Sequence, residues 1–369
     1  MTYDVIVVGL GAMGSATACH LARRGLRVLG LDRFSPPHPF GSSHGETRII
    51  REAYFEHPVY VPMVQRAYEL WRVLEKESGT TLLRETGGVM IGIPDSDLVK
   101  GAQHSAELHG LRHQMLTASE VRERFPALHP ESDMVAVWEP RAGVLFAEAC
   151  IDAHLAQARR HCAALHYEEP MLRWEPESDG IRVLTGESEY RARQLIVTAG
   201  PWISTLFPDL PLRVERQVLF WFDEATASGT FTPERCPIHL WQFDGPRFFY
   251  GFPNLGNGVK VAFHHGGEIT TIDTARREVA LDEVEDIRSA MRRFLSIADG
   301  TLRATAVCVY TNTPDEHFLI DRHPAHSQVL IASACSGHGF KFSPVIGEIL
   351  ADLAQDKRPR FDLRLFRSR

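Results

Sequence analysis

The chain has 369 residues, of which 44% are hydrophobic and 24% charged, and its formal net charge at pH 7 is −7. A chain of this length and composition is typical of a globular protein of one or two domains with a sizeable core. The negative charge argues against nucleic acid and anionic membranes as main partners, because neither attracts an acidic protein.

The cysteines and histidines indicate neither a disulfide framework nor a metal site. The six cysteines are scattered without a CxxC pair, which favours a reducing compartment and shows no zinc spacing. No HExxH motif occurs among the 18 histidines, and His109 and His113 lie in a polar stretch without an evident third ligand. We therefore expect no metal.

The N-terminal stretch between Asp4 and Arg23 contains no charged residue, so a membrane segment has to be considered. Glycines and small polar residues interrupt this stretch, and no basic segment precedes it. A strand, a glycine turn and a helix explain it better than a signal peptide or an anchor. We expect a cytoplasmic protein without membrane contact.

The first predicted elements form a βαβ unit. Tyr3–Val8 is a short run rich in β-branched residues, which is typical of a buried parallel strand. The sequence GLGAMG follows from residue 9, and a helix is expected from about Met13 to Arg24, ended by a glycine. The next strand covers Arg27–Leu31 and ends at Asp32.

The glycine motif has the spacing of a dinucleotide-binding turn. Gly9 allows the tight turn, Gly11 lets the backbone approach a pyrophosphate, and Gly14 lets helix and strand pack closely. The phosphates would lie at the helix N-terminus, where free N–H groups and the helix dipole favour anions. Asp32 is placed to accept hydrogen bonds from a ribose hydroxyl. A glycine turn in another kind of αβ unit is the alternative, and FAD and NAD share this fingerprint.

Further strands and helices follow a loop at 35–45 that is too rich in Pro, Gly and Ser for regular structure. The expected elements are helices at 60–78, 151–164, 282–295 and 343–354, a mixture of short strands and polar helix at 82–138, a hairpin at 180–191, and strands at 195–200, 217–222, 248–263 and 329–333.

Strand–glycine elements near residues 9, 200 and 337 are far apart in the sequence, and a nucleotide domain built from three segments would bring them around one ligand. We therefore predict an α/β fold in two parts. The expected parts are a discontinuous, Rossmann-like nucleotide-binding domain at 1–85, 140–215 and 305–369, and a more antiparallel, α+β substrate-binding lobe at 86–139 and 216–304.

Five segments carry a resemblance to a known family: Gly41–Arg51 (GSSHGETRIIR), Thr198–Trp202 (TAGPW), Tyr250–Pro253 (YGFP), Ala306–Thr311 (AVCVYT) and Ser336–Phe342 (SGHGFKF). In order and rough spacing they resemble the monomeric sarcosine oxidase and N-methyltryptophan oxidase family across nearly the whole chain. The resemblance implies a monomeric, flavin-dependent amine oxidase whose nucleotide is FAD, and whose partners are a small amino-acid-like amine and O2.

The resemblance also implies a covalent flavin and a cationic clamp for the substrate. Cys308 matches the cysteine whose sulfur forms a thioether with the flavin 8α-methyl group, although a free cysteine by itself is more often a buried small hydrophobe. Arg51 and Lys341 match the pair that holds the substrate carboxylate, with a bidentate fork and a compact charge. Solvated surface positions are the alternative for both cations.

Two further positions match catalytic residues of the family. Lys260 matches the lysine that promotes the reaction of reduced flavin with oxygen, where a fixed positive charge stabilises developing superoxide; a solvent-facing strand residue is the alternative. His264 matches an active-site histidine, and in an extended strand it lies on the same face as Lys260. His265 is then expected to point away and to be structural.

Arg48 is expected close to the flavin, and Tyr250 and Tyr310 match residues that line the substrate pocket, although a core role is as common for such tyrosines. The helix beginning near Ser343 would direct its N-terminus at the flavin pyrimidine, where it would stabilise negative charge on the reduced ring. The full set of expected cofactor-binding residues is Gly9, Gly11, Gly14, Asp32, Ser43, Arg48, Gly337, His338, Gly339 and Lys341.

The chain departs from the family pattern at two positions. Ser43 stands where relatives often carry a second histidine beside His44, which changes one polar contact near the cofactor. Trp241 is expected at the pocket wall, where its indole would shrink or reshape the cavity.

The reaction implied by the resemblance is oxidation of an N-methyl amino acid such as sarcosine to an imine, which hydrolyses to a primary amino acid and formaldehyde while O2 becomes H2O2. N-methyl-L-tryptophan and pipecolate remain open as substrates. A flavin dehydrogenase that uses another electron acceptor and a flavin- or amine-binding module without turnover are the other functions considered.

Overall fold

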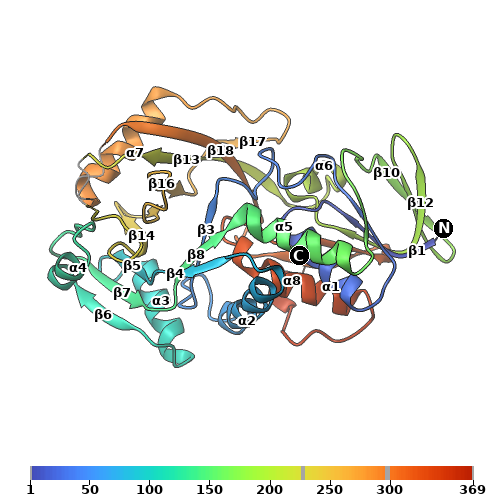
Figure 1. Cartoon of the computed structure of the whole chain (residues 1–369), viewed down its shortest axis with the longest axis horizontal. Coiled ribbons are helices and arrows are strands. Elements are labelled where there is room, and N and C mark those ends of the chain that lie inside the picture. Colours follow the sequence, from blue (N-terminus) through green and yellow to red (C-terminus); the bar gives the residue numbers. More distant parts are fainter. Residues whose placement is uncertain (1, 226–228, 296–299, 368–369) are drawn as a thin grey trace.

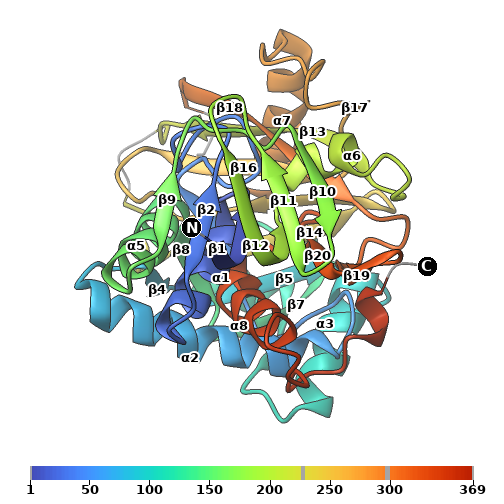
Figure 2. The ribbon, with the colours of Figure 1, turned by 90° about the vertical axis from the view of Figure 1, so that its right-hand side faces the viewer.

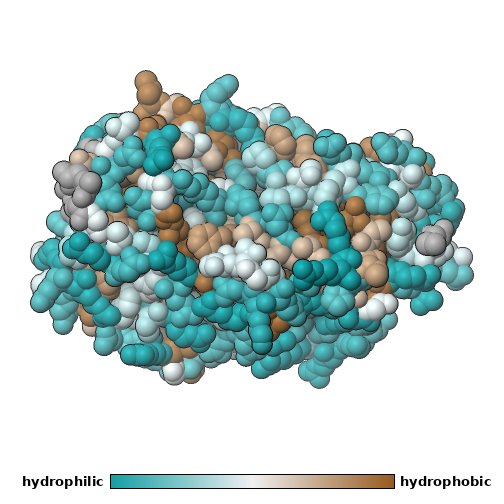
Figure 3. All heavy atoms as spheres, in the orientation of Figure 1, coloured by the Kyte–Doolittle hydropathy of each residue, from teal (hydrophilic) through white to brown (hydrophobic). Residues whose placement is uncertain are grey.

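The computed structural model describes residues 2–225, 229–295 and 300–367. Its two large sheets lie side by side along the longest axis of the molecule, and the N-terminus is at the outer edge of one of them (Figure 1). The view in Figure 3 shows a surface that is mostly hydrophilic, with hydrophobic residues in smaller patches.

The first sheet has eight strands: β1 (Thr2–Val8), β2 (Val28–Leu31), β9 (Ala164–His166), β10 (Arg173–Glu177), β11 (Gly180–Leu184), β12 (Glu189–Val197), β19 (Leu319–His323) and β20 (His326–Ser333). Six follow the order β10–β11–β12–β1–β2–β9, while β20 pairs with both β12 and β19. The associated helices are α1 (Ala12–Arg23), α2 (Tyr60–Ser78), α5 (Ala147–Arg160) and α8 (Ser343–Leu353). Helix α1 packs against both α5 and α8, and Figure 2 shows α1 and α8 together below the sheet.

Strand β1 lies between two parallel neighbours, β2 and β12, and its side chains are buried on both faces. Ile6 and Val7 are fully buried, which explains why β1 is a continuous apolar run without alternation. The following helix packs tightly on the strand end, because a Cβ on Gly14 would lie 1.7 Å from the carbonyl oxygen of Gly9. The predicted βαβ unit is confirmed.

The second sheet has nine strands: β5 (Gly88–Gly92), β6 (Gln114–Thr117), β7 (Val135–Glu139), β13 (Arg213–Phe222), β14 (Ile238–Phe243), β15 (Arg247–Gly251), β16 (Val259–His264), β17 (Ile269–Thr270) and β18 (Leu302–Asn312). The β14–β5 pair is parallel, and the other pairs described are antiparallel, which agrees with the expected antiparallel lobe. Helices α3 (Asp97–Leu108), α4 (Ala118–Arg124) and α7 (Leu281–Phe294) accompany this sheet. The amphipathic α7 buries Ile287, Met291 and Phe294 in its core.

A small third sheet lies between the two large ones (Figure 1). It consists of β3 (Thr47–Ile50), β8 (Gly143–Phe146) and β4 (Leu83–Glu85), in the order β3–β8–β4. Strand β3 carries Arg48, and Arg51 follows its last residue. A short helix α6 (Ile203–Leu206) follows the glycine turn after β12.

Most expected elements are confirmed, with three local differences. The helix expected at 151–164 occupies Ala147–Arg160, with Glu148 in its first turn and two arginines in its last, as the helix dipole favours. Cys162, with φ of 66°, ends this region, and β9 follows. The strand β3 was not predicted because its four residues directly follow a glycine-rich segment. The strand expected at 248–263 is divided into β15 and β16, with a turn at residues 252–258 between them.

The predicted domain boundaries stay a prediction. The second sheet receives β18, which pairs along its length with β13, from the C-terminal part of the chain. In the part of the chain that is described, no helix combines the length and the apolar character needed to cross a bilayer.

Candidate functional site

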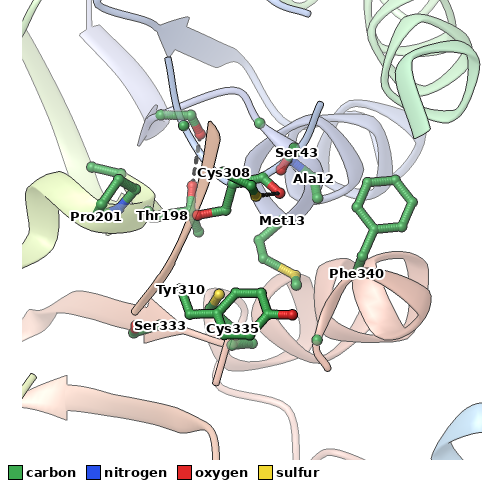
Figure 4. A pocket seen from close by; sticks show the side chains of 18 of the residues that line it. Ala12, Met13, Ser43, Thr198, Pro201, Cys308, Tyr310, Ser333, Cys335 and Phe340 are labelled. Carbon is green, nitrogen blue, oxygen red and sulfur yellow. Dashed lines mark hydrogen bonds between the residues drawn. The ribbon is translucent and has the colours of Figure 1, made fainter. Parts of the chain in front are cut away.

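A cavity of about 410 Å³ lies at the carboxyl ends of β1, β2, β12 and β20 and reaches the second sheet. The strand–glycine elements at Gly9, Gly200 and Gly337 all line it, so the expected convergence of three distant segments is confirmed. Figure 4 shows Met13, Thr198 and Ser333 from these segments around the same space, together with Cys308 of the second sheet. Carboxyl ends of parallel strands are the usual position for a ligand in this kind of sheet.

The N-terminal turn has the geometry of a phosphate cradle. Gly9 has φ of +86°, and a Cβ there would lie 2.6 Å from the Ala199 Cα and the Thr198 carbonyl oxygen, so only glycine fits. Among the described residues, Gly11 caps α1 without a side-chain hydrogen bond, and the first turn holds no acidic residue. Apart from the Ala12 N–H, which makes a long hydrogen bond to Ser43 Oγ, the N–H groups of that turn are therefore available to an anion.

Asp32 lies at the cavity wall and is largely occupied by backbone groups. Its Oδ2 accepts a hydrogen bond from the Leu10 N–H at 2.6 Å, and its Oδ1 accepts one from the Phe34 N–H at 2.9 Å. His38 Nε2 lies 3.7 Å from Oδ1. Burial raises the pKa of Asp32, and the hydrogen bonds to the backbone oppose this rise.

The cavity has the features that an FAD molecule requires. Ser333 presents a buried Oγ that has no partner among the described residues, which suits a polar ligand. Phe340 and Lys341 line the cavity just before α8, whose first turn contains Pro344 and, in the described chain, no acidic residue. Ser43 lines the cavity too, and its Oγ accepts a long hydrogen bond from the Ala12 N–H at 3.4 Å.

Cys308 lies on β18 facing the cavity, and only 2% of it is exposed. Its Sγ is 3.6 Å from Nη2 of Arg48 and 3.5 Å from the Ser42 carbonyl oxygen. Arg48 is fixed by hydrogen bonds to the carbonyl oxygens of Thr47, Ser42 and His44. The Cys308 sulfur therefore lies beside a fixed positive charge.

Arg51 and Lys341 are both buried, and both line the cavity. Lys341 Nζ donates to the His338 carbonyl oxygen at 2.8 Å and to the Tyr54 hydroxyl at 3.3 Å. Burial lowers the pKa of Lys341 to about 7, and the charge of Arg51 acts in the same direction. The structure thus brings together the two cations that the sequence suggested as a carboxylate clamp.

Glu56, which sequence reasoning missed, is the partner of Arg51. Nη2 of Arg51 lies 2.8 Å from each carboxylate oxygen of Glu56, and Nη1 donates to the Ala53 carbonyl oxygen at 2.8 Å. Burial opposes the charge of Glu56, but Arg51 together with His338 and Lys341 outweighs it, and the pKa of this carboxyl stays below its usual value. The five-residue spacing of the two opposite charges was the available signal in the sequence.

Lys260 and His264 lie on the same strand, but the structure places only His264 in the wall of the large cavity. Lys260 Nζ donates to the carbonyl oxygens of Gly45 and Thr47 at 2.5 and 2.9 Å and to Thr47 Oγ1 at 3.0 Å. It borders a separate small pocket of about 10 Å³. Burial, assisted by Arg48, lowers the pKa of Lys260 well below its ordinary value.

One wall of the cavity is aromatic. Tyr250, Tyr310 and His264 line it, and the Tyr310 hydroxyl lies 3.2 Å from His264 Nδ1. Burial lowers the pKa of His264 well below 6.5, so its ring is neutral at pH 7. His338 also lines the cavity, and its Nδ1 lies 2.6 Å from the Tyr54 hydroxyl.

Trp241 was expected at the pocket wall, and this expectation is wrong. Its side chain is fully buried in the core of the second sheet, where it stacks on Phe294 at 4.9 Å and donates from Nε1 to His239 Nδ1. The preceding residue, Leu240, lines the cavity instead. Successive side chains of a strand point to opposite faces, so Trp241 is turned away.

His265 leaves the cavity wall as expected, although it contacts residues that form it. Its Nδ1 lies 3.2 Å from Glu215 Oε2, and its ring centroid is 4.2 Å from that of His264 and 5.4 Å from that of Tyr310. Cys335 is a further cavity residue that sequence reasoning missed. Within residues 2–225, 229–295 and 300–367, no group of three or more His, Cys, Asp or Glu side chains is arranged to hold a metal ion.

Comparison with known proteins gives consistent similarities. The model of the FAD dependent oxidoreductase family (DAO) matches residues 4–353. A monomeric sarcosine oxidase of Streptomyces avermitilis is 49% identical over 359 residues, which cover 96% of this chain and 94% of that protein. An N-methyl-L-tryptophan oxidase of Salmonella arizonae is 36% identical over 100% of this chain and 98% of its own. Among solved structures, the Tyr258Phe mutant of NikD, described as an unusual amino acid oxidase, is 24% identical with a TM-score of 0.88 over 100% of this chain and 97% of that chain.

Proposed function

The chain belongs to the FAD dependent oxidoreductase family, and on that premise we propose that it oxidises small amino acids that carry an N-methyl amine, with sarcosine as the leading substrate. One observation carries the proposal: two buried cations, Arg51 and Lys341, line the same cavity as three strand–glycine elements. The cavity therefore combines a dinucleotide cradle with a site for a small carboxylate.

When FAD is bound, the chemistry that it supplies is the two-electron oxidation of the carbon–nitrogen bond and the reduction of O2 to H2O2. Arg51 and Lys341 orient the substrate by its carboxylate. His264 is neutral and adds no charge, whereas the two cations disfavour a further positive charge nearby, so they promote the unprotonated amine that oxidation requires. Water hydrolyses the imine product to a primary amino acid and formaldehyde.

Two further residues are proposed to act near the flavin. Arg48 is assigned to the edge of the flavin ring, because its guanidinium lies beside Cys308. Lys260 is assigned to oxygen activation, supported by its burial against the segment that carries Arg48.

A flavin dehydrogenase stays the second candidate, because Lys260 Nζ already donates three hydrogen bonds to acceptors within the protein. Strong dye reduction with weak oxygen consumption would favour the dehydrogenase.

The test of the function is an anaerobic titration of the purified protein, in which flavin absorbance is followed. Sarcosine, N-methyl-L-tryptophan and pipecolate are the candidates, and methylamine is the control that lacks a carboxylate. We expect sarcosine to bleach the flavin at the lowest concentration and methylamine to bleach it poorly. A protein that stays colourless with added FAD, or a flavin that none of the panel bleaches, would contradict the proposal.

We also propose that the flavin is held covalently by a thioether between Cys308 Sγ and its 8α-methyl group. Forming this C–S bond releases two electrons and two protons, which O2 can take up. Two observations support this linkage: the sulfur of Cys308 faces the cavity, and the Arg48 guanidinium lies beside it.

Acid precipitation tests the covalent bond. We expect flavin to stay with the precipitated wild-type protein and to be released from Cys308→Ser. Cys335→Ser is the matched control, because its thiol also lines the cavity, and it should retain the flavin. Flavin that washes from the wild type, or that stays bound in Cys308→Ser, would refute the linkage.

We propose that the protein works as a monomer, in keeping with the name of its relative, and light scattering would test this. The cytoplasmic location stays a prediction.

A further inference from the structure

The segment that carries Arg51 is held by the second sheet and its helix. After β3 ends at Ile50, residues 51–59 have no regular structure until α2 begins. Ser105 Oγ on α3 donates to the Tyr54 carbonyl oxygen at 2.5 Å, and the Phe55 ring stacks on Phe248 of β15 with centroids 5.6 Å apart. The position of Arg51 therefore depends on contacts made by residues far away in the chain.

Glu139 makes the most direct of these contacts. It is the last residue of β7, and only 1% of it is exposed. Its Oε1 accepts a hydrogen bond from the Glu52 N–H at 2.7 Å, and its Oε2 accepts one from the Ala53 N–H at 2.8 Å. A buried carboxylate is costly unless it is hydrogen-bonded, and bonds to an ionised acceptor are the stronger kind. Burial raises the pKa of Glu139 to about 7, and the two N–H groups oppose this rise.

The hydrogen bonds continue from Glu139 to the guanidinium of Arg51. Glu139 fixes the N–H of Ala53, and the carbonyl oxygen of the same Ala53 accepts a hydrogen bond from Arg51 Nη1 at 2.8 Å. The guanidinium fork is planar and rigid, so anchoring one arm sets the direction of the other. That other arm carries Nη2, which binds the Glu56 carboxylate.

We propose that Glu139 is a positioning residue for substrate binding, which fixes the backbone at residues 52–53 so that Arg51 presents its guanidinium to the substrate carboxylate. The proposal rests on the proposed function, because it takes Arg51 as the carboxylate-binding residue. Glu139 itself does not line the cavity, so its effect passes through the backbone and Arg51.

The chain offers a matched control in Glu52. This carboxyl is also buried and lies next to Arg51 in the sequence, but its Oε1 accepts a hydrogen bond from Arg141 Nη1 at 3.0 Å, whereas Glu139 binds the backbone. Glu52→Gln therefore removes a neighbouring buried charge and leaves the two backbone bonds in place. Glu139→Gln preserves size, but its amide NH2 faces an N–H donor and loses one of the bonds.

The experiment compares full-length, flavin-loaded wild type, Glu139→Gln, Glu139→Asp and Glu52→Gln. Acetate is the binding probe, and its Kd is read from the change in flavin absorbance. Sarcosine gives KM and kcat, and hydrogen exchange of a peptide spanning 51–56 reports on the backbone. For Glu139→Gln we expect acetate Kd and sarcosine KM to rise about tenfold, corresponding to the loss of one hydrogen bond, with kcat changed less than about twofold and faster exchange. Glu52→Gln should match the wild type.

Glu139→Asp keeps the charge on a shorter side chain, and we expect it to restore part of the affinity. If Glu139→Gln does not yield flavin-loaded protein, the test rests on Glu139→Asp alone. A raised acetate Kd in Glu139→Asp then supports the proposal, and a wild-type Kd overturns it. Unchanged affinities in Glu139→Gln, or equal losses in Glu139→Gln and Glu52→Gln, would also overturn it while the proposed function stands. If the wild-type flavin responds to neither acetate nor sarcosine, the proposed function fails and the positioning role fails with it.

Discussion

Lys341 holds an amine in surroundings that disfavour its charge. Only 5% of the residue is exposed, its Nζ has two protein acceptors, and Arg51 lies on the same cavity wall. Burial is the main reason that the pKa of Lys341 falls to about 7. A carboxylate bound beside it would favour the protonated form, so carboxylate binding and proton uptake are coupled at this residue.

We expect the affinity of the loaded protein for acetate to fall by up to about tenfold per pH unit above pH 7, because only the protonated form of Lys341 pairs with the anion. Flavin-absorbance titrations at pH values between about 6.5 and 8.5, which bracket the pKa of about 7, would measure this slope. In Lys341→Met the affinity should be weaker at every pH and nearly independent of pH, since Arg51 stays charged. The same slope in the variant and the wild type would assign the titration to another group.

At the scale of elements, the end of β16 is joined to β13 by a partly buried ion pair. His265 follows β16 with φ of 63°, and its Nδ1 lies 3.2 Å from Glu215 Oε2 on β13. Burial opposes the charge of His265, but the hydrogen bond to Glu215 and the charges of the nearby carboxylates together outweigh it, so the pKa of His265 is raised. For Glu215, burial is likewise outweighed by the hydrogen bonds from His265, the Gly267 N–H and Asn312 taken together with the charge of His265, so the pKa of this carboxyl is lowered.

These opposite shifts set the pH range in which the pair stabilises the fold. A raised histidine pKa contributes stability that is complete below the unfolded value of about 6.5 and is lost as pH rises through the folded pKa. A lowered glutamate pKa contributes stability that is complete above the unfolded value of about 4.3 and is lost as pH falls. The pair therefore contributes most between roughly pH 4.5 and 6.5.

We expect His265→Asn to lower the free energy of unfolding by about 1.5–3 kcal/mol at pH 6, the usual value of a hydrogen bond to a charged group, and by less at pH 9. Asparagine is chosen because it tolerates a positive φ. Denaturant unfolding at the two pH values measures the difference. Glu316→Gln is the control, because Glu316 is exposed and lies 3.8 Å from the same ring. An equal loss at both pH values would mean that the charge of His265 contributes nothing.

At the scale of the whole molecule, the cavity is where separate parts of the chain meet. Its wall takes residues from β1, from the turn after β12 and from the turn after β20, and faces Cys308 and Tyr310 of the second sheet. A ligand that fills the cavity contacts all of these at once. Binding to the folded state alone raises stability by mass action.

We expect FAD to stabilise flavin-free Cys308→Ser protein by about 2.7 kcal/mol at a concentration one hundred times its Kd, with a midpoint that rises with FAD concentration. Thermal unfolding with increasing FAD measures this. ADP is the control, because it can fill only the end of the cavity at Gly9 and Asp32, so its shift at the same concentration should be smaller. A midpoint that FAD does not move would count against the cavity as its site.

The sequence alone predicted the features that short windows contain. The β-branched run of β1, the glycine turn after it, the 3.6-residue pattern of α2 and α7 and the glycine turn before Lys341 are local, and each was found where expected. The family resemblance also placed Arg51, Lys341, His264 and Cys308 around one ligand, and all four line one cavity. Their chemical roles are proposals that the tests above address.

The tertiary structure decided which distant residues meet. The pairing of β3 with β8 and of β18 with β13, and the packing of these strands around the cavity, bring Cys308 within 3.6 Å of Arg48, and the position of β7 brings Glu139 to the backbone after Arg51. Strand register turned Trp241 into the core and Leu240 toward the ligand. Local residue patterns fix helices, strands and turns, whereas sheet order and register depend on the packing of the whole chain, so these contacts followed only from the folded molecule.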